Sequence, residues 1–117
     1  MAKYYLTERA AIHLRQIYNY TVERWGEKQA GIYMQKIVKH FQTLAAKPEI
    51  GRSRKDNPAQ YFMAEIEKHH AIYRKFRGGI IVAAVLHTKR DIEGIMNQIG
   101  SALAFEISII EENIEEK

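Results

Sequence analysis

Two clusters of basic residues carry the side chains best suited to binding an anion. They are the stretches GRSRK, residues 51–55, and YRKFR, residues 73–77. Lysine and arginine bind phosphate groups, and Tyr73 and Phe76 add aromatic rings on which a base can stack. Two interpretations remain open at this point: a contact with nucleic acid, or a solvated basic face without a ligand.

The histidines do not have the spacing of a metal site. The chain has five of them, at His13, His40, His69, His70 and His87. No two lie four residues apart on one predicted helix, and neighbouring residues of a strand point to opposite faces. The chain has no cysteine, which excludes thiolate ligands, disulfides and a thiol nucleophile. We expect no metal and no cofactor.

The charge is distributed unevenly along the chain. The net charge is +4, but residues 106–117 contain five glutamates and one lysine, a net −4, so the rest of the chain carries +8. A body this basic favours an anionic partner, because Coulomb attraction raises local concentration and association rate without fixing specificity.

The length and composition predict one globular domain. The chain has 117 residues, of which 46% are hydrophobic and 27% charged. No apolar run approaches the roughly 20 residues needed to span a bilayer. The N-terminal MAKYYLTERA lacks the form of a secretory signal. We expect a cytoplasmic protein without a membrane partner.

The N-terminal half predicts a strand followed by two helices with almost no linker. The run KYYL leads to Thr7, a helix-capping residue. Gly26 ends the first helix, because glycine reaches the left-handed conformation freely, and Pro48 stops the second. One face of each helix repeats at steps of three and four: Leu14, Ile17, Tyr18, Thr21 and Trp25, then Ala30, Tyr33, Met34, Ile37, Phe41 and Leu44. We expect a helical hairpin with both faces, Trp25 included, in the core.

The second half predicts an exposed loop, three strands and a helix. The loop is EIGRSRKDNPAQ, residues 49–60, and the strands are YFMAEIEK, HHAIYRKF and GIIVAAVLH. Gly78 and Gly79 are expected to form the tight turn before the last strand, which should be central and most buried. Asp91 should cap a short helix that ends at Gly100. The predicted fold class is α+β, with the hairpin packed on a mainly antiparallel sheet.

Four stretches resemble the ParE branch of the RelE/ParE toxin superfamily. They are YTVERWGEKQAGIY (20–33), LAAKPEIGRSR (44–54), IYRKF (72–76) and VLHTKRD (85–91), and the resemblance extends over residues 4–92. It implies a RelE/ParE-like toxin domain over residues 1–100, with residues 101–117 as an acidic amphipathic helical extension of that domain. It also implies a type II toxin–antitoxin system of the kind used in plasmid stabilisation.

Two activities divide this superfamily. ParE-like members are not enzymes: they inhibit DNA gyrase by binding it, and a cognate antitoxin neutralises them. RelE-like members cut messenger RNA on the ribosome. The resemblance to the ParE branch implies the first activity. The alternatives are a RelE-like mRNA endonuclease and a non-toxic family member that only binds an antitoxin.

A metal-independent ribonuclease needs groups that deprotonate the 2′-hydroxyl, stabilise the phosphorane and protonate the leaving oxygen. Arg74 matches the position of a catalytic arginine in RelE-like enzymes, and Lys89 or Arg90 lies near a second basic position. His87 precedes the tail helix, where those enzymes keep a tyrosine or a histidine–tyrosine pair. Residues 90–100 contain neither type. This missing proton carrier favours the gyrase-binding interpretation.

A binding toxin would use exposed basic and aromatic residues instead. In the ParE interpretation an antitoxin grips the helical hairpin, while Arg24 and Lys28 on its outer face meet the target. The candidate contacts with target or antitoxin are Arg24, Trp25, Lys28, Arg52, Arg54, Tyr73, Arg74, Arg77 and Arg90.

The C-terminal stretch SALAFEISIIEENIEEK, residues 101–117, extends beyond the resemblance. Its apolar seam repeats at steps of four, three and four: Leu103, Ile107, Ile110 and Ile114. An isolated helix of this length is marginal in water, so it should dock on something. Three alternatives remain: it packs on its own sheet, it occupies the antitoxin groove with its acidic end over Arg74, Arg77 and Arg90, or it forms a homodimer.

Overall fold

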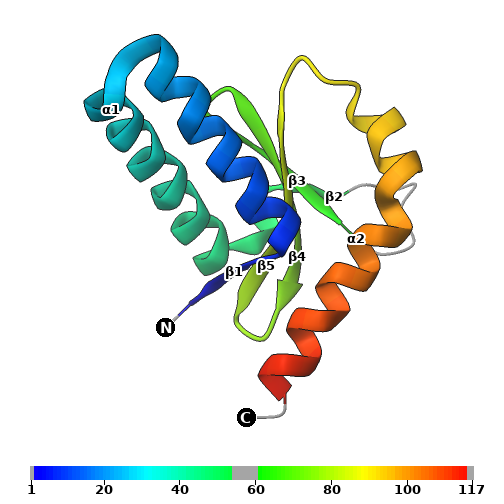
Figure 1. Cartoon of the computed structure of the whole chain (residues 1–117). Helices are drawn as coiled ribbons and strands as arrows, with labels where there is room; N and C mark the ends of the chain where they lie inside the picture. Colours follow the sequence, from blue (N-terminus) through cyan, green and yellow to red (C-terminus); the bar gives the residue numbers. More distant parts are fainter. Residues whose placement is uncertain (1, 54–60, 116–117) are drawn as a thin grey trace.

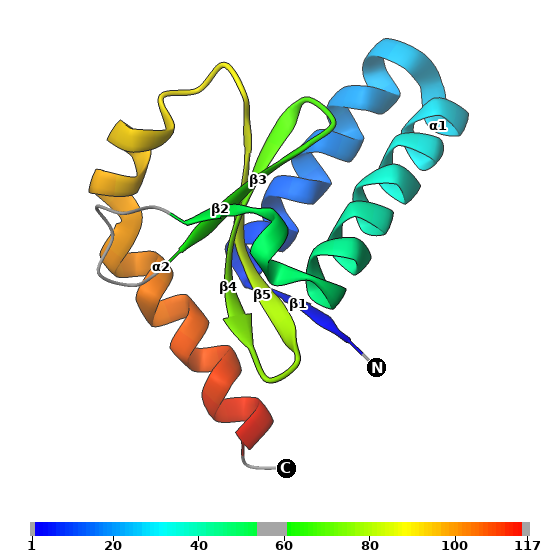
Figure 2. The same ribbon diagram turned by 180° about the vertical axis from the view of Figure 1, so that it is seen from behind.

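The computed structural model describes residues 2–53 and 61–115, which form three layers. A five-stranded sheet lies between α1 (Glu8–Ala46) on one face and α2 (Ile92–Glu115) on the other (Figures 1 and 2). The strand order is β1 (Tyr4–Leu6), β5 (Gly79–His87), β4 (His69–Phe76), β3 (Phe62–Ile66) and β2 (Arg52–Ser53). Strand β1 is parallel to β5, and the other neighbours are antiparallel. The predicted α+β fold class is confirmed.

The predicted helical hairpin is formed by α1, which folds back on itself at Gly26. This residue has φ 88°, in the left-handed region that favours glycine, so one residue reverses the chain. At the other end of the first arm, the Thr7 hydroxyl accepts a hydrogen bond from the Ala10 amide at 3.1 Å, as expected of a cap. Figure 1 shows the two arms side by side against the sheet.

The predicted faces of the hairpin are buried or half-buried except at two residues, Tyr18 and Trp25, and Tyr18 is 36% exposed. Leu14, Ile37, Phe41 and Leu44 pack in a core cluster between α1 and the sheet. Trp25, in contrast, is 70% exposed, so the prediction that it belongs to the core was wrong. It directly precedes Gly26, at the end of the hairpin that extends past the sheet, where nothing covers the helical face.

The C-terminal segment forms one helix rather than the short helix expected to end at Gly100. The Asp91 carboxylate caps α2 by accepting the Gly94 amide at 3.1 Å. The helix then continues through Gly100, because the apolar seam continues on both sides of it, and burying that seam outweighs a glycine's cost of about 1 kcal/mol. Leu103 and Ile107 are fully buried, and Ile110 and Ile114 pack on the same cluster. The seam therefore docks on the chain's own sheet.

The turn before β5 also differs from the prediction. Phe76 pairs with Gly79, so the two turn residues are Arg77 and Gly78, with φ of 43° and 74°. Gly79 is instead the first residue of β5. A Cβ atom there would overlap the Lys3 carbonyl, so glycine is required by the close approach of the chain entering β1.

The loop after α1 contains more structure than expected. Pro48–Ile50 form a 3₁₀ turn, and Arg52–Ser53 pair with β3 as the edge strand β2, while residues 54–60 of the predicted loop lie outside the described part. Strand β5 is almost entirely buried, as predicted. Strand β5 has a neighbour on each side, but it is not the central strand as predicted. The central strand is β4, because only β1 lies beyond β5 on one side whereas β3 and β2 lie beyond β4 on the other. Within the described residues, neither helix combines the length and apolar character that a bilayer crossing requires.

Candidate functional site

The end of the helical hairpin gathers exposed aromatic and cationic side chains. Trp25 is 70% exposed and Tyr20 is 57% exposed, and Arg24 and Lys28 are exposed beside them. We call these four residues the hairpin tip. The Arg24 guanidinium lies 5.3 Å from the Tyr20 ring centroid, and its Nε donates to the Tyr20 hydroxyl at 3.1 Å.

These contacts restrain Arg24 before any partner arrives. An ordered side chain loses less conformational freedom when a complex forms, which lowers the cost of binding. Tryptophan, tyrosine and arginine are the residue types that most often dominate binding energy at protein interfaces. The hairpin tip is therefore a pre-ordered surface suited to binding a protein.

The residues expected of a ribonuclease are not brought together. Arg74 pairs with Ile81, whose side chain belongs to the cluster under α2. His87 pairs with His69, whose ring contacts Tyr33 of α1, on the opposite face of the sheet. Six residues of strand separate His87 from the residue opposite Arg74, which corresponds to about 20 Å. In this structure Arg74 and His87 cannot act on one phosphate.

The remaining basic candidates are dispersed. Lys89 and Arg90 are exposed after β5, where their amides donate to His87, through its Nδ1 atom and its carbonyl respectively. Arg77 lies in the β4–β5 turn, and Arg52 is exposed on β2. Arg54 lies outside the described residues. These positions therefore form no single basic surface with the hairpin tip.

Tyr73 is buried and serves the loop after α1 instead of offering a stacking surface. Its hydroxyl donates to the Pro48 carbonyl at 2.7 Å and accepts the Gly51 amide at 3.0 Å. Its ring stacks on Phe62, with centroids 5.6 Å apart. Burial raises the pKa of the Tyr73 hydroxyl, which keeps the donated proton in place. A Cβ on Gly51 would overlap this hydroxyl, which links the glycine of the loop to the tyrosine of β4.

Two histidines have structural roles that the sequence did not reveal. The amide of Val85 donates to Nδ1 of His13 at 3.1 Å, beyond the point at which β1 ends, so α1 closes the edge of β5. Burial, then Arg9 and Arg90, lower the pKa of His13. His69 contacts the Tyr33 hydroxyl at 3.1 Å, and burial, then the other two histidines nearby, lower its pKa to about 4. Both rings are therefore neutral at pH 7.

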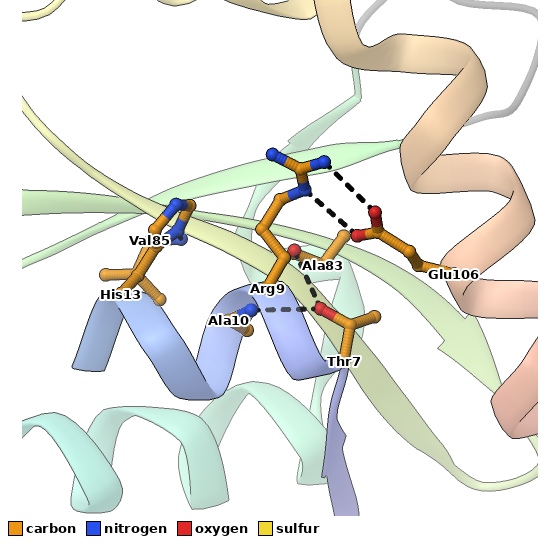
Figure 3. A network of polar contacts seen from close by, with 7 residues as sticks. All are labelled: Thr7, Arg9, Ala10, His13, Ala83, Val85 and Glu106. Atoms are coloured by element: carbon orange, nitrogen blue, oxygen red, sulfur yellow. Dashed lines mark hydrogen bonds and ion pairs between the residues drawn. The ribbon is translucent and has the colours of Figure 1, made fainter. Parts of the chain in front are cut away.

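No group of three or more metal-ligating side chains occurs within the described ranges 2–53 and 61–115. The side chains that meet between α1 and α2 form an ion pair instead. Figure 3 shows Arg9 of α1 donating two hydrogen bonds to Glu106 of α2, at 2.9 and 3.0 Å. The same view shows Thr7 donating to the Ala83 carbonyl, at 2.9 Å.

The comparisons with known proteins agree with this geometry. The family model described as ParE toxin of type II toxin-antitoxin system, parDE, matches residues 4–92. Two curated relatives from Mycobacterium tuberculosis, strains H37Rv and CDC 1551, are both named Toxin ParE1. Each is 32% identical over 93 residues, which cover 79% of this chain and 95% of the relative. The chain belongs to the ParE toxin family.

A solved structure shares the ParE fold. It is titled chromosomal ParDE TA system from P. aeruginosa, and it superimposes with a TM-score of 0.64 at 23% identity. The match covers 76% of this chain and 98% of that chain.

The match to the ParE family model ends where α2 begins. The family match stops at residue 92, and α2 spans Ile92–Glu115. Glu106 of α2 pairs with Arg9, which the sequence did not predict, and within the described ranges α2 forms no ion pair with Arg74 or Arg90. The seam proposed for a homodimer is buried against the sheet, so a second copy cannot use it while α2 is docked.

Proposed function

We propose that this ParE-family chain is a toxin that inhibits DNA gyrase by binding it and is neutralised by a cognate antitoxin. The observation that carries the proposal is the hairpin tip, where Tyr20, Arg24 and Trp25 form a pre-ordered surface on the outer end of α1. Family membership over residues 4–92 supports the toxin assignment. A toxin that binds gyrase would act in the cytoplasm, and this location is part of the proposal.

Binding rather than catalysis accounts for the arrangement of the residues. The groups that a ribonuclease would need, Arg74 and His87, lie on opposite faces of the sheet. The tip, in contrast, needs only rigidity and exposure. One glycine joins the two arms of α1, so the tip is held in place by two packed helices and cannot swing independently of the core.

The test is a gyrase cleavage assay. The purified chain is incubated with gyrase, ATP and supercoiled plasmid, and detergent and protease then release any linear DNA. Linear product that requires both proteins is expected. Trp25→Ala or Arg24→Ala should lower the apparent affinity about 30-fold, as for interface residues whose truncation costs about 2 kcal/mol. Lys36→Ala is the matched control, because Lys36 is an exposed cation of α1 outside the tip.

Two other results would redirect the assignment. If no linear DNA forms but ribosome-bound mRNA is cleaved and Arg74→Ala abolishes that cleavage, the chain is a RelE-like endonuclease. If both assays are negative and the chain still binds an antitoxin, it is a non-toxic member of the family. Equal loss of gyrase activity in Lys36→Ala and Trp25→Ala would show that the tip is not the contact.

A further inference from the structure

We infer that the second arm of α1 binds the phosphate backbone of the DNA duplex that gyrase holds, while the hairpin tip binds gyrase itself. This inference rests on the proposed function, because it names a second surface that the toxin offers to the complex of gyrase and DNA. The second arm follows Gly26 and ends at Ala46, with Lys47 as its C-cap. Its exposed cations, which we call the lysine face, are Lys28, Lys36, Lys39 and Lys47.

The exposed side of the second arm carries no negative charge. Residues 28–47 contain the four lysines and no aspartate or glutamate, although the chain has 14 acidic residues. Exposed helices are commonly stabilised by pairs of opposite charge three or four residues apart, and this segment has none. A surface with charges of one sign attracts a polyanion. The other exposed residues of the segment are Gln29, Ile32, Gln35, Gln42, Thr43 and Ala46.

The lysines point in one direction, away from the sheet. A helix turns about 100° per residue, which places Lys28, Lys36 and Lys39 within about 80° of one another. The buried residues of the arm, such as Ile37 and Phe41, lie on the opposite side of the helix. The arm extends about 28 Å between its first and last lysines, which is the length of about eight base pairs of duplex DNA.

The ammonium groups of the lysine face are open to an external anion. Within the described ranges, no carboxylate forms an ion pair with any of them, since Glu67 pairs with His40 and Glu49 pairs with Lys75. The acidic helix α2 lies across the sheet, on the opposite side of the molecule from the second arm (Figures 1 and 2). The described carboxylates therefore leave the charge of the lysine face unpaired.

The residue types favour nucleic acid over a protein or a lipid surface. Aromatic anchors dominate protein interfaces, and membrane-bound helices bury an apolar face. The exposed side of the second arm has one large apolar residue, Ile32, which is 41% exposed. Lysine, glutamine and threonine, in contrast, are residue types that bind phosphate and sugar oxygens. The lysine face is suited to the backbone of a duplex.

The lysine face is continuous with the hairpin tip, because Lys28 belongs to both. A toxin that binds gyrase through the tip would bring the rest of the second arm close to the DNA that the enzyme holds. Contacts with phosphates carry no sequence information and weaken as salt rises. The tip would therefore select gyrase, and the lysine face would add affinity for gyrase with DNA over gyrase alone.

The experiment measures binding of the full chain to a fluorescent DNA duplex of about 20 base pairs, without gyrase. The lysine variant is Lys39→Gln with Lys47→Gln, the two members farthest along the chain from the tip. The control variant, Lys3→Gln with Lys89→Gln, removes the same charge from exposed lysines outside the second arm. Loss of two phosphate contacts should lower DNA affinity about tenfold and reduce the slope of log affinity against log salt by about two. The control variant should lose less than about threefold. Both variants should keep the melting temperature of the wild type, because the substituted side chains are exposed.

The gyrase cleavage assay separates this inference from the proposed function. The lysine variant should need about tenfold more protein than the wild type to give the same linear product. Lys36→Ala removes a single phosphate contact, so it should cost about threefold, well below the loss expected at the tip.

Two results would overturn the inference even if the wild type traps cleaved DNA on gyrase. One is equal DNA affinity in the lysine and control variants. The other is binding of the wild type to poly-glutamate as tightly as to the duplex, which would assign the lysine face to an acidic protein segment. If the wild type forms no linear product but the lysine variant still loses DNA affinity, the proposed function fails and the binding of DNA by the lysine face stands.

Discussion

The two faces of the sheet differ in how their polar groups are satisfied. On the face under α1, Tyr73 bonds two backbone groups, and Thr7 and His13 close the exposed edge of β5. On the face under α2, the Tyr61 hydroxyl and the His70 ring each retain an unpaired buried atom. Both faces carry a buried apolar cluster under a helix. Coverage alone therefore does not mean complementarity, and only the first face is fitted to its helix.

The largest contrast should come from removing one large side chain from each face. Phe41→Ala, under α1, should lower the free energy of unfolding by about 3–5 kcal/mol, because Phe41 is fully buried in the core that holds the sheet. Leu103→Ala, under α2, should cost less than Phe41→Ala, because its effect is limited to the free energy of docking α2. Urea unfolding measures both.

Hydrogen exchange identifies the reason for that contrast. In Leu103→Ala the amides of β5 should keep most of their protection while those of α2 lose theirs. If the β5 amides lose equal protection in both variants, the two faces unfold as one cooperative unit. That result would contradict the difference between the faces.

The two buried tyrosines provide a matched pair of smaller changes. Tyr73→Phe removes two hydrogen bonds and leaves the Gly51 amide without its partner, so it should cost about 1–3 kcal/mol. Tyr61→Phe removes a hydroxyl that has no partner, so it should be neutral or stabilising. Thermal unfolding of the two variants provides the measurement. A loss of stability in Tyr61→Phe as large as that in Tyr73→Phe would contradict the difference between the faces.

The pH dependence of stability should reflect the neutral histidine under α1. The pKa of His69 is lowered from 6.5 to about 4, so between these values the unfolded chain binds a proton that the folded chain does not. The contribution of neutral His69 to the free energy of unfolding is complete above pH 6.5 and is lost as the pH falls toward 4. After allowance for solvent screening we expect about 1–2 kcal/mol. In His69→Gln the free energy of unfolding should depend less on pH between 4 and 6.5. An unchanged slope of stability against pH in that variant would assign the effect to other groups.

The smallest effect on stability is expected at the hairpin tip. Trp25→Ala should change the free energy of unfolding by less than about 0.5 kcal/mol, because the side chain is 70% exposed. This is the reverse of what a core tryptophan would show. Chemical unfolding of the variant is the check, and a loss above 2 kcal/mol would show that Trp25 packs against the sheet in solution.

The sequence predicted the elements well because their signals are local. The cap at Thr7, the break at Gly26 and the apolar run of β5 each depend on neighbouring residues. The prediction failed where packing against a distant segment of the chain determines whether a residue is buried or a helix continues. Trp25 continues a helical face past the end of the sheet, and Gly100 lies within an apolar seam that another layer buries.

The candidate site was harder to predict for the same reason. Arg74 and Tyr73 are adjacent in the chain, but the alternation of β4 sends them to opposite faces. Which face α2 would cover, and hence which of them lies under it, has no signal in local spacing. Arg24, Trp25 and Lys28 of the tip were selected from the sequence, but Tyr20 was missed. The separation of Arg74 from His87 required the sheet register.

The ion pair between Arg9 and Glu106 joins residues 97 positions apart, and this separation has a consequence for the order of synthesis. The ribosome completes every strand of the sheet before it begins α2. At about 5–20 residues per second, the 24 residues of α2 take roughly one to five seconds to add. Arg9 and Glu106 can meet only after nearly the whole chain has been made, so the docking of α2 on the sheet is one of the last steps of folding.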